Sequence, residues 1–143
     1  MFIDPNARVP ISDDEGNTIF IKAKMDIATD TAVTVEFARI NSGTGFRAQK
    51  AYELALLYHN IVAWEGPAFK RPVLSKAGTP MLKNGAPVTE PIPCTRQAIG
   101  SLDPFAPLVA RVLAAIDEQN REVLAEPDPK KLTSQSASDA AAT

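Results

Sequence analysis

The chain has 143 residues, of which 45% are hydrophobic and 22% charged, as is typical of a globular protein with one core of ordinary size. Seventeen acidic and fifteen basic residues give a formal charge of −2, which does not predict a nucleic-acid partner, because such binding requires a concentrated basic face. No apolar run approaches the roughly 18 residues of a membrane span, the N-terminus does not resemble a secretory signal, and a single cysteine excludes an internal disulfide. We therefore expect a cytoplasmic protein without membrane contact, with one domain over residues 1–125.

The N-terminal residues predict a β-hairpin. Residues 8–11 are typical of a short edge strand, because Pro10 has no amide hydrogen to donate to a ladder. The turn follows at residues 12–17, where short polar side chains and a glycine favour local backbone hydrogen bonds. In residues 18–24, Ile19, Ile21 and Ala23 share one face and Phe20, Lys22 and Lys24 share the other, as in a half-buried strand.

Residues 26–40 fit two structures. Their β-branched residues alternate as in a strand, whereas Val33, Phe37 and Ile40 also fall at helical spacing and residues 29–30 offer a helix cap. We expect a helix that ends at the glycine-rich loop that follows it.

A second, largely buried helix is predicted for residues 49–64, and the glycine-proline pair at 66–67 ends it. Its apolar side chains repeat at intervals of three and four and form one stripe: Leu54, Leu57, Ile61 and Trp64.

Residues 65–95 contain six of the twelve prolines, so long regular elements are not expected there. The Asn84-Gly85 pair is typical of a type I′ turn and predicts a small projecting hairpin. We therefore expect a Pro/Gly-rich projecting loop or hairpin insertion in this part of the chain.

The strongest periodic signal predicts a final amphipathic helix from about 104–107 to 124, after a single short helix bounded by Thr95 and Gly100. Residues 126–143 contain one large apolar residue, Leu132, and we expect a disordered tail. The expected fold is α+β, with a small N-terminal β-hairpin packed with three to four helices. The stripe of the final helix consists of Phe105, Leu108, Val109, Val112, Leu113 and Ile116.

The reactive residue types are too few to predict catalysis, a metal site or a cofactor. His59 is the only histidine and Cys94 the only cysteine, so a zinc site of several such ligands is excluded. A Cys94–His59 nucleophilic pair would need the two residues together, and nothing in their spacing brings them together. Trp64 and the final helix therefore either complete the core or bind a partner. We expect a protein that is not an enzyme.

Several short motifs occur in an order that resembles the tail assembly chaperones of long-tailed bacteriophages and prophages. The strand-then-helix opening at residues 19–40 is similar to the same group, and the likeness spans roughly residues 1–122. Residues 70–84 look like an insertion relative to the group. The motifs are LALLYHNIVAWEGPAF (54–69), GAPV (85–88), PIPCTRQAI (91–99), LDP (102–104) and a terminal helix that ends IDEQN (116–120).

The resemblance implies a non-enzymatic assembly factor in the cytoplasm of the bacterial host. Such a protein binds the tape-measure protein, keeps it soluble while tail-tube subunits assemble, and then leaves the particle. Tail-tube protein is a further possible partner, and a homo-oligomer is compatible with the likeness. The alternative is a structural tail or head–tail connector protein that stays in the virion. The expected partner-binding residues are Trp64, Phe105, Leu108, Val109, Val112, Leu113 and Ile116.

Overall fold

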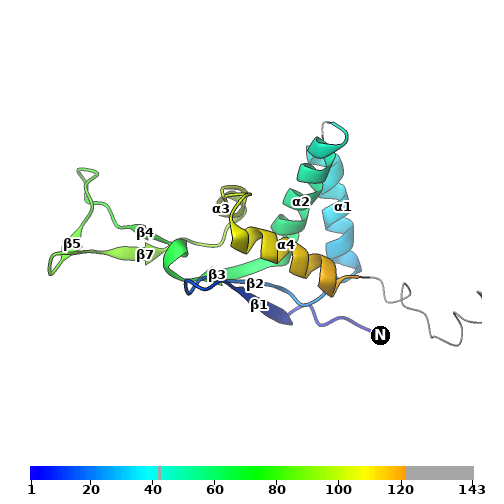
Figure 1. Ribbon diagram of the computed structural model, residues 1–143, viewed down its shortest axis with the longest axis horizontal. Helices are drawn as coiled ribbons and strands as arrows, with labels where there is room; N and C mark the ends of the chain where they lie inside the picture. Colours follow the sequence, from blue (N-terminus) through cyan, green and yellow to red (C-terminus); the bar gives the residue numbers. More distant parts are fainter. Residues whose placement is uncertain (42, 122–143) are drawn as a thin grey trace, which may run out of the picture.

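Figure 1 shows the computed structural model, in which helices cover a small sheet and a narrow arm projects from one end. The structure describes residues 1–41 and 43–121, so the predicted tail and the predicted domain end at residue 125 lie outside the described residues. The α+β prediction is confirmed, because these described residues form four α-helices beside the N-terminal hairpin. The elements in chain order are β1 (Arg8–Ser12), β2 (Thr18–Lys22), α1 (Ile27–Ile40), α2 (Phe46–Asn60), β3 (Ile61–Glu65), the 3-10 helix η1 (Pro67–Phe69), β4 (Lys70–Pro72), β5 (Leu82–Lys83), β6 (Ala86–Pro87), β7 (Thr89–Pro91), α3 (Arg96–Gly100) and α4 (Pro107–Gln119).

The predicted hairpin is present and is part of a larger, antiparallel sheet of order β1-β2-β3. Pro10 lies in the edge strand β1, opposite Phe20 of β2. Proline lacks an amide hydrogen, and an edge strand tolerates this because no further strand pairs with its outer side. Ile19 and Ile21 of the central strand are fully buried. The alternation in the sequence therefore identified the face of β2 that packs on the core.

The prediction of a helix as far as Trp64 is wrong, because α2 ends at Asn60 and the next five residues form β3. The buried Asn60 side chain donates from Nδ2 to the Leu56 carbonyl at 2.9 Å, a local bond that competes with continuation of the helix. The β-branched Ile61 and Val62 then pair with β2. Gly66 and Pro67 consequently follow a strand and open η1, and they do not end the helix as predicted.

A bulge in β3 explains the misleading spacing. Ile61 pairs with Ile21 and Trp64 pairs with Ile19. These partners lie on one face of β2, although residues three apart point to opposite faces of a regular strand. The register shift leaves Val62 as an extra residue, which brings Ile61 and Trp64 onto the same face.

The helix predicted between residues 26 and 40 is confirmed as α1, which forms a helical hairpin with α2 (Figure 1). Its cap is Asp26, whose Oδ1 accepts from the Thr29 amide at 2.8 Å, and the positions 29–30 expected for this role lie inside the helix. Val33 is buried against the core, while the Phe37 ring meets Tyr52 of α2 edge-on at 5.9 Å.

The final helix is shorter than predicted. Pro107 occupies the first turn of α4, where a missing amide hydrogen costs nothing, and the helix ends at Gln119. Phe105 therefore precedes the helix and is 83% exposed, which corrects its assignment to the stripe. α4 packs across β1, β2 and α2. Within the described residues, the buried hydrophobic core consists of Ile19, Ile21, Val33, Ala55, Leu56, Leu57, Ile61, Phe69, Ile99, Leu108, Val109, Val112 and Ile116.

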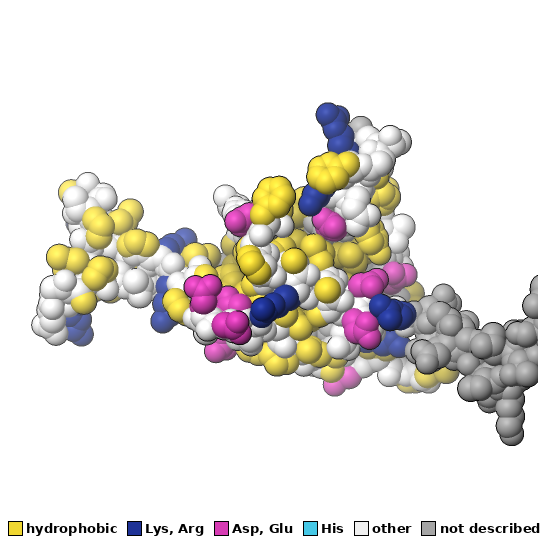
Figure 2. Space-filling view, in the orientation of Figure 1, with side chains coloured by type: hydrophobic (Ala, Val, Ile, Leu, Met, Phe, Trp, Pro, Cys, Tyr) yellow, Lys and Arg dark blue, Asp and Glu magenta, His cyan; other side chains and the backbone are white. Residues whose placement is uncertain are grey.

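The predicted projecting hairpin is confirmed as an arm, residues 70–91, in which β4 pairs with β7 and β5 pairs with β6. Asn84 and Gly85 have φ values of 54° and 80°, the combination that a type I′ turn requires. Figure 2 shows hydrophobic side chains on the arm, away from the body. The large exposed ones are Leu74, Met81 and Leu82.

The connection from β3 to η1 lies directly against the β1–β2 turn. Asn17, which is buried in this turn, accepts at Oδ1 from the Ala68 amide at 2.8 Å and donates from Nδ2 to Asp13 at 2.9 Å. Gly66 has a φ of 123°, and a Cβ there would lie 2.6 Å from both the Gly16 carbonyl oxygen and Asn17 Oδ1. Only glycine fits this contact without displacement of the turn.

We expect Gly66→Ala to lower the free energy of unfolding by about 2–4 kcal/mol, because it adds both a steric clash and an unfavourable φ. The matched control is Gly78→Ala in the arm, where φ is 83° but no atom lies within 4 Å of the added Cβ. We expect Gly78→Ala to lower the free energy of unfolding by about 1 kcal/mol, because only the positive φ is unfavourable for alanine there. Urea unfolding of the two variants measures the difference, and equal losses would contradict the close contact at Gly66.

Candidate functional site

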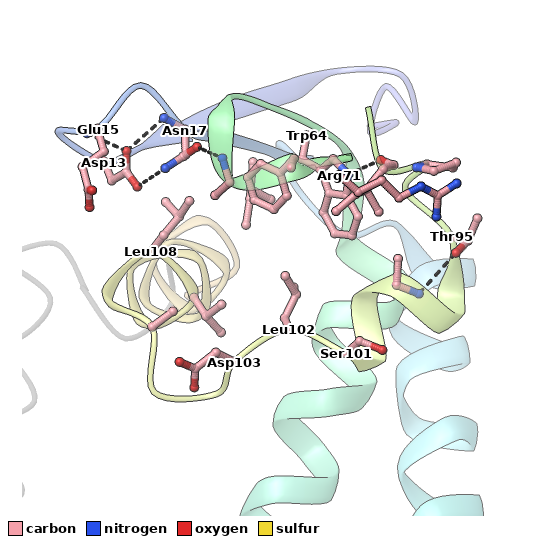
Figure 3. Close-up of a pocket in the computed structure, with 18 of the residues that line it drawn as sticks. Asp13, Glu15, Asn17, Trp64, Arg71, Thr95, Ser101, Leu102, Asp103 and Leu108 are labelled. Carbon is pink, nitrogen blue, oxygen red and sulfur yellow. Dashed lines mark hydrogen bonds between the residues drawn. The ribbon is translucent and has the colours of Figure 1, made fainter. Parts of the chain in front are cut away.

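An open groove of about 870 Å³ lies between the sheet, η1, α3 and the start of α4 (Figure 3). This volume is in the range of ligand-binding clefts in proteins. Its lining is predominantly apolar, and polar side chains stand at its edges. We call it the Trp64 groove. Its apolar lining consists of Ile19, Trp64, Ala68, Phe69, Ile92, Pro93, Ala98, Leu102, Ala106, Pro107, Leu108 and Val109.

Two stacked aromatic rings form one wall of the Trp64 groove. The rings of Trp64 and Phe69 are nearly parallel, with centroids 4.8 Å apart. Trp64 Nε1 donates to the Ile92 carbonyl at 2.7 Å, and the Ile92 amide donates to the Phe69 carbonyl at 2.7 Å. The indole is thus satisfied as a donor and held in place, so its apolar face is available to the groove.

The opposite walls come from α3 and α4. Thr95 caps α3 by accepting from the Ala98 amide at 3.2 Å, which places the half-buried Ala98 side chain in the lining. Leu108 and Val109, in the first turns of α4, are buried beside it. Half-buried Leu102, from the connection between the two helices, lies between these walls (Figure 3).

A buried carboxylate holds α3 against the helical hairpin. Glu36 of α1 is only 7% exposed and accepts from Arg96 of α3 at 2.6 Å, from Arg39, and lies 3.3 Å from His59 Nε2 of α2. The hydrogen bond from Arg96 is the largest cause that lowers the pKa of Glu36 to about 2. The carboxylate is therefore ionised at neutral pH and joins three helices.

Tyr58 supplies a second contact for α3. The guanidinium of Arg96 lies over the Tyr58 ring, 4.0 Å from its centroid. A Cβ on Gly100, at the end of α3, would lie 2.7 Å from Tyr58 Oη, so glycine permits the close approach of the two helices. The wall that α3 forms is thus positioned from both of its ends.

The predicted partner-binding residues fall into three groups. Trp64, Leu108 and Val109 line the Trp64 groove. Phe105 is exposed outside it, with its ring 5.8 Å from the Lys50 ammonium. The remaining three do not present a free helix face to a partner. Val112 and Ile116 are buried in the core, and Leu113 is half-buried against it.

Sequence reasoning missed Phe69 and Glu36. Phe69 is separated from Trp64 by a glycine-proline corner, so no periodicity connects the two rings. Glu36 did carry a signal, since it is a charged residue next to the apolar positions Val33 and Phe37 on the inner side of α1. Arg39 lies three residues after Glu36 on the same helix, a spacing that the sequence does show, whereas His59 and Arg96 come from positions that no sequence spacing relates to it.

The rim of the Trp64 groove is acidic on one side. Figure 3 shows Asp13 and Glu15 above Leu108 with Asp103 below it, whereas Arg71 and Thr95 lie on the far side. Hydrogen bonds from the Asn17 side chain and backbone lower the pKa of Asp13. In Figure 2, acidic side chains gather over the β1–β2 turn, beside the hydrophobic surface of the body.

The candidate nucleophilic pair of the sequence, Cys94 and His59, lies in surroundings that do not favour a reactive thiolate. Burial raises the pKa of the Cys94 thiol, which disfavours the reactive thiolate. His59 is directed to Glu36, as described above. Neither residue lines the Trp64 groove, which offers shape and charge for binding.

Comparisons of the chain with protein-family models, with curated proteins and with solved structures gave no match. Within residues 1–41 and 43–121, no group of three or more His, Cys, Asp or Glu side chains is arranged to hold a metal ion. In the same described part of the chain, no helix has the length and apolar character to cross a membrane.

We expect Glu36→Gln to lower the free energy of unfolding at neutral pH by about 1–3 kcal/mol, because Arg96, Arg39 and His59 lose a charged acceptor. The folded pKa of about 2 lies below the ordinary value of 4.5, so the contribution of Glu36 is complete above about pH 4.5 and disappears as pH falls through about 2.

Urea unfolding at about pH 7 and pH 3 measures this effect. We expect the difference in the free energy of unfolding between wild type and Glu36→Gln to be smaller at pH 3. Glu53→Gln is the control, since Glu53 forms a more exposed pair with Lys50 and is expected to cost under about 1 kcal/mol. A gap that stays constant with pH would contradict the role of the Glu36 charge.

Proposed function

We propose that this chain is a tail assembly chaperone of a long-tailed bacteriophage or prophage, which binds the tape-measure protein and keeps it soluble while the tail tube assembles. It acts without catalysis, in the cytoplasm of the bacterial host. The observation that carries the proposal is the Trp64 groove, an apolar surface of about 870 Å³ that stays open beside a complete core. The order of motifs through LALLYHNIVAWEGPAF, which resembles that group, supports the same reading.

The physical task of such a chaperone fits a groove of this kind. A long helical protein exposes apolar stripes until the tube covers it, and exposed stripes aggregate. An apolar groove binds one face of an amphipathic helix through side chains at helical spacing. The groove offers one face of a helix a limited contact area, and small interfaces are typical of transient complexes that can be exchanged for tube subunits.

The residues divide this work between contact and support. Trp64, Leu108 and Val109 provide apolar contact within the groove. Phe105, exposed in the connection next to the groove-lining Asp103 and Ala106, offers an additional apolar contact at its edge. The inner stripe of α4 keeps the groove wall fixed to the sheet and to α2.

We expect Ala98→Glu to reduce co-purification of the tape-measure protein encoded in the same phage or prophage genome by about ten-fold or more, since it places a charge in the apolar groove. Ala114→Glu is the matched control, because Ala114 is exposed on α4 and does not line the groove. Both variants are compared after co-expression, with circular dichroism and urea unfolding to show that each is folded. Equal retention by the two variants would contradict binding through the groove.

Mass spectrometry of purified virions separates a chaperone from a structural tail or connector protein. A chaperone leaves before the particle is complete, so we expect at most traces of this chain. Stoichiometric amounts in mature particles would overturn the proposal.

A further inference from the structure

The acidic rim of the Trp64 groove has charges that the fold itself does not use. Among the described residues, Glu15 and Asp103 have no basic side chain within 4 Å of their carboxylates. Asp103 accepts only a local bond from the Phe105 amide at 2.9 Å. The basic residue that lines the far side, Arg71, is paired with Glu90 at 3.2 Å.

The neighbouring Asp13 is more fully occupied. Its carboxylate accepts from the Asn17 and Glu15 amides and the Asn17 side chain, each at 2.9 Å. Arg111, which donates to the Ser12 carbonyl at 2.9 Å, adds a favourable charge nearby. Asp13 therefore orders the turn, while Glu15 and Asp103 remain for a partner on either side of Leu108 (Figure 3).

We propose that the Trp64 groove selects an amphipathic helix whose apolar stripe is bordered by lysine or arginine side chains. The inference rests on the proposed function and specifies which segments of the partner are bound. Apolar side chains of the helix contact Trp64 and Leu108, and its basic side chains lie against Glu15 and Asp103. A helix bordered by acidic residues brings like charges together at the same positions and is disfavoured.

The magnitude of this selection follows from the exposure of the rim. Each exposed charge pair changes affinity by only about two- to five-fold, and several together produce about ten-fold or more. The apolar contact supplies most of the affinity, and the charges decide between similar helices. Because the pairs are exposed, salt reduces the discrimination.

The test uses two synthetic helical peptides of about 18 residues with the same leucine stripe, bordered in one by lysine and in the other by glutamate. Neither contains tryptophan, so Trp64, the only tryptophan of the chain, reports binding to the groove by its fluorescence. We expect the lysine peptide to bind about ten-fold tighter in about 0.05 M salt, with a smaller difference in about 0.5 M salt.

Variants locate the selection on the rim. Glu15→Gln and Asp103→Asn each weaken binding of the lysine peptide by about two- to five-fold and leave binding of the glutamate peptide unchanged or tighter. Asn at 103 retains an oxygen acceptor for the Phe105 amide, so the connection keeps its local bond. The control is Glu118→Gln, an exposed change in α4 away from the groove lining, which is expected to have no effect.

Equal affinity for the two peptides, or no response to Glu15→Gln and Asp103→Asn, would overturn the selection of basic helices. That result leaves the proposed function standing if the tape-measure protein still co-purifies. Conversely, the groove could prefer the lysine peptide while the tape-measure protein does not bind. That result would refute the proposed function and leave the preference of the groove for basic helices standing. The arm contains four basic residues: Lys70, Arg71, Lys76 and Lys83. Self-association of the wild type that is lost in both rim variants would identify the arm of a second copy as the occupant and overturn the inference.

Discussion

The close contact between Gly66 and the β1–β2 turn is the constraint on which the Trp64 groove depends. The backbone of β3 reaches the turn at a distance that admits no side chain, and Asn17 holds the following residues through the Ala68 amide. The chain can then reverse within η1 and return Phe69 onto Trp64. The corner thus lies between Trp64 and Phe69 along the chain and directly precedes β4, the first strand of the arm.

A charged contact positions the other side of the groove. The short α3 has too few residues to be stable alone, and its attachment depends on Arg96, which meets both Glu36 and the Tyr58 ring. The cost of burying the Glu36 carboxylate is offset by three donors from different elements. One wall is therefore placed by backbone proximity and the other by ionic hydrogen bonds, which explains how an apolar surface stays open beside a closed core.

Charge is unevenly distributed between the body and the arm. The rim of the groove is acidic, while the arm has Lys70, Arg71, Lys76 and Lys83 against a single acid, Glu90. The arm also exposes apolar side chains (Figure 2). The arm and the Trp64 groove are therefore both apolar surfaces, but their charges are opposite. For a chaperone of the proposed kind, such charges would set which partner is chosen without making release slow.

Local propensity and periods along single elements were enough to predict the N-terminal hairpin, the Asn84-Gly85 turn and the inner stripe of α4. For residues 26–40 the same signals fitted both a strand and a helix, and the helical hairpin with α2 resolved the choice in favour of α1. The sequence did not determine β3, because the bulge at Val62 gives Ile61 and Trp64 the three-residue spacing of a helix. Only pairing with β2, forty residues earlier, decided between the two structures. The groove likewise required tertiary structure: Trp64, Phe69 and Leu108 meet because the Gly66 corner, the cap of α3 and the crossing of α4 bring them together, and no sequence period relates these positions.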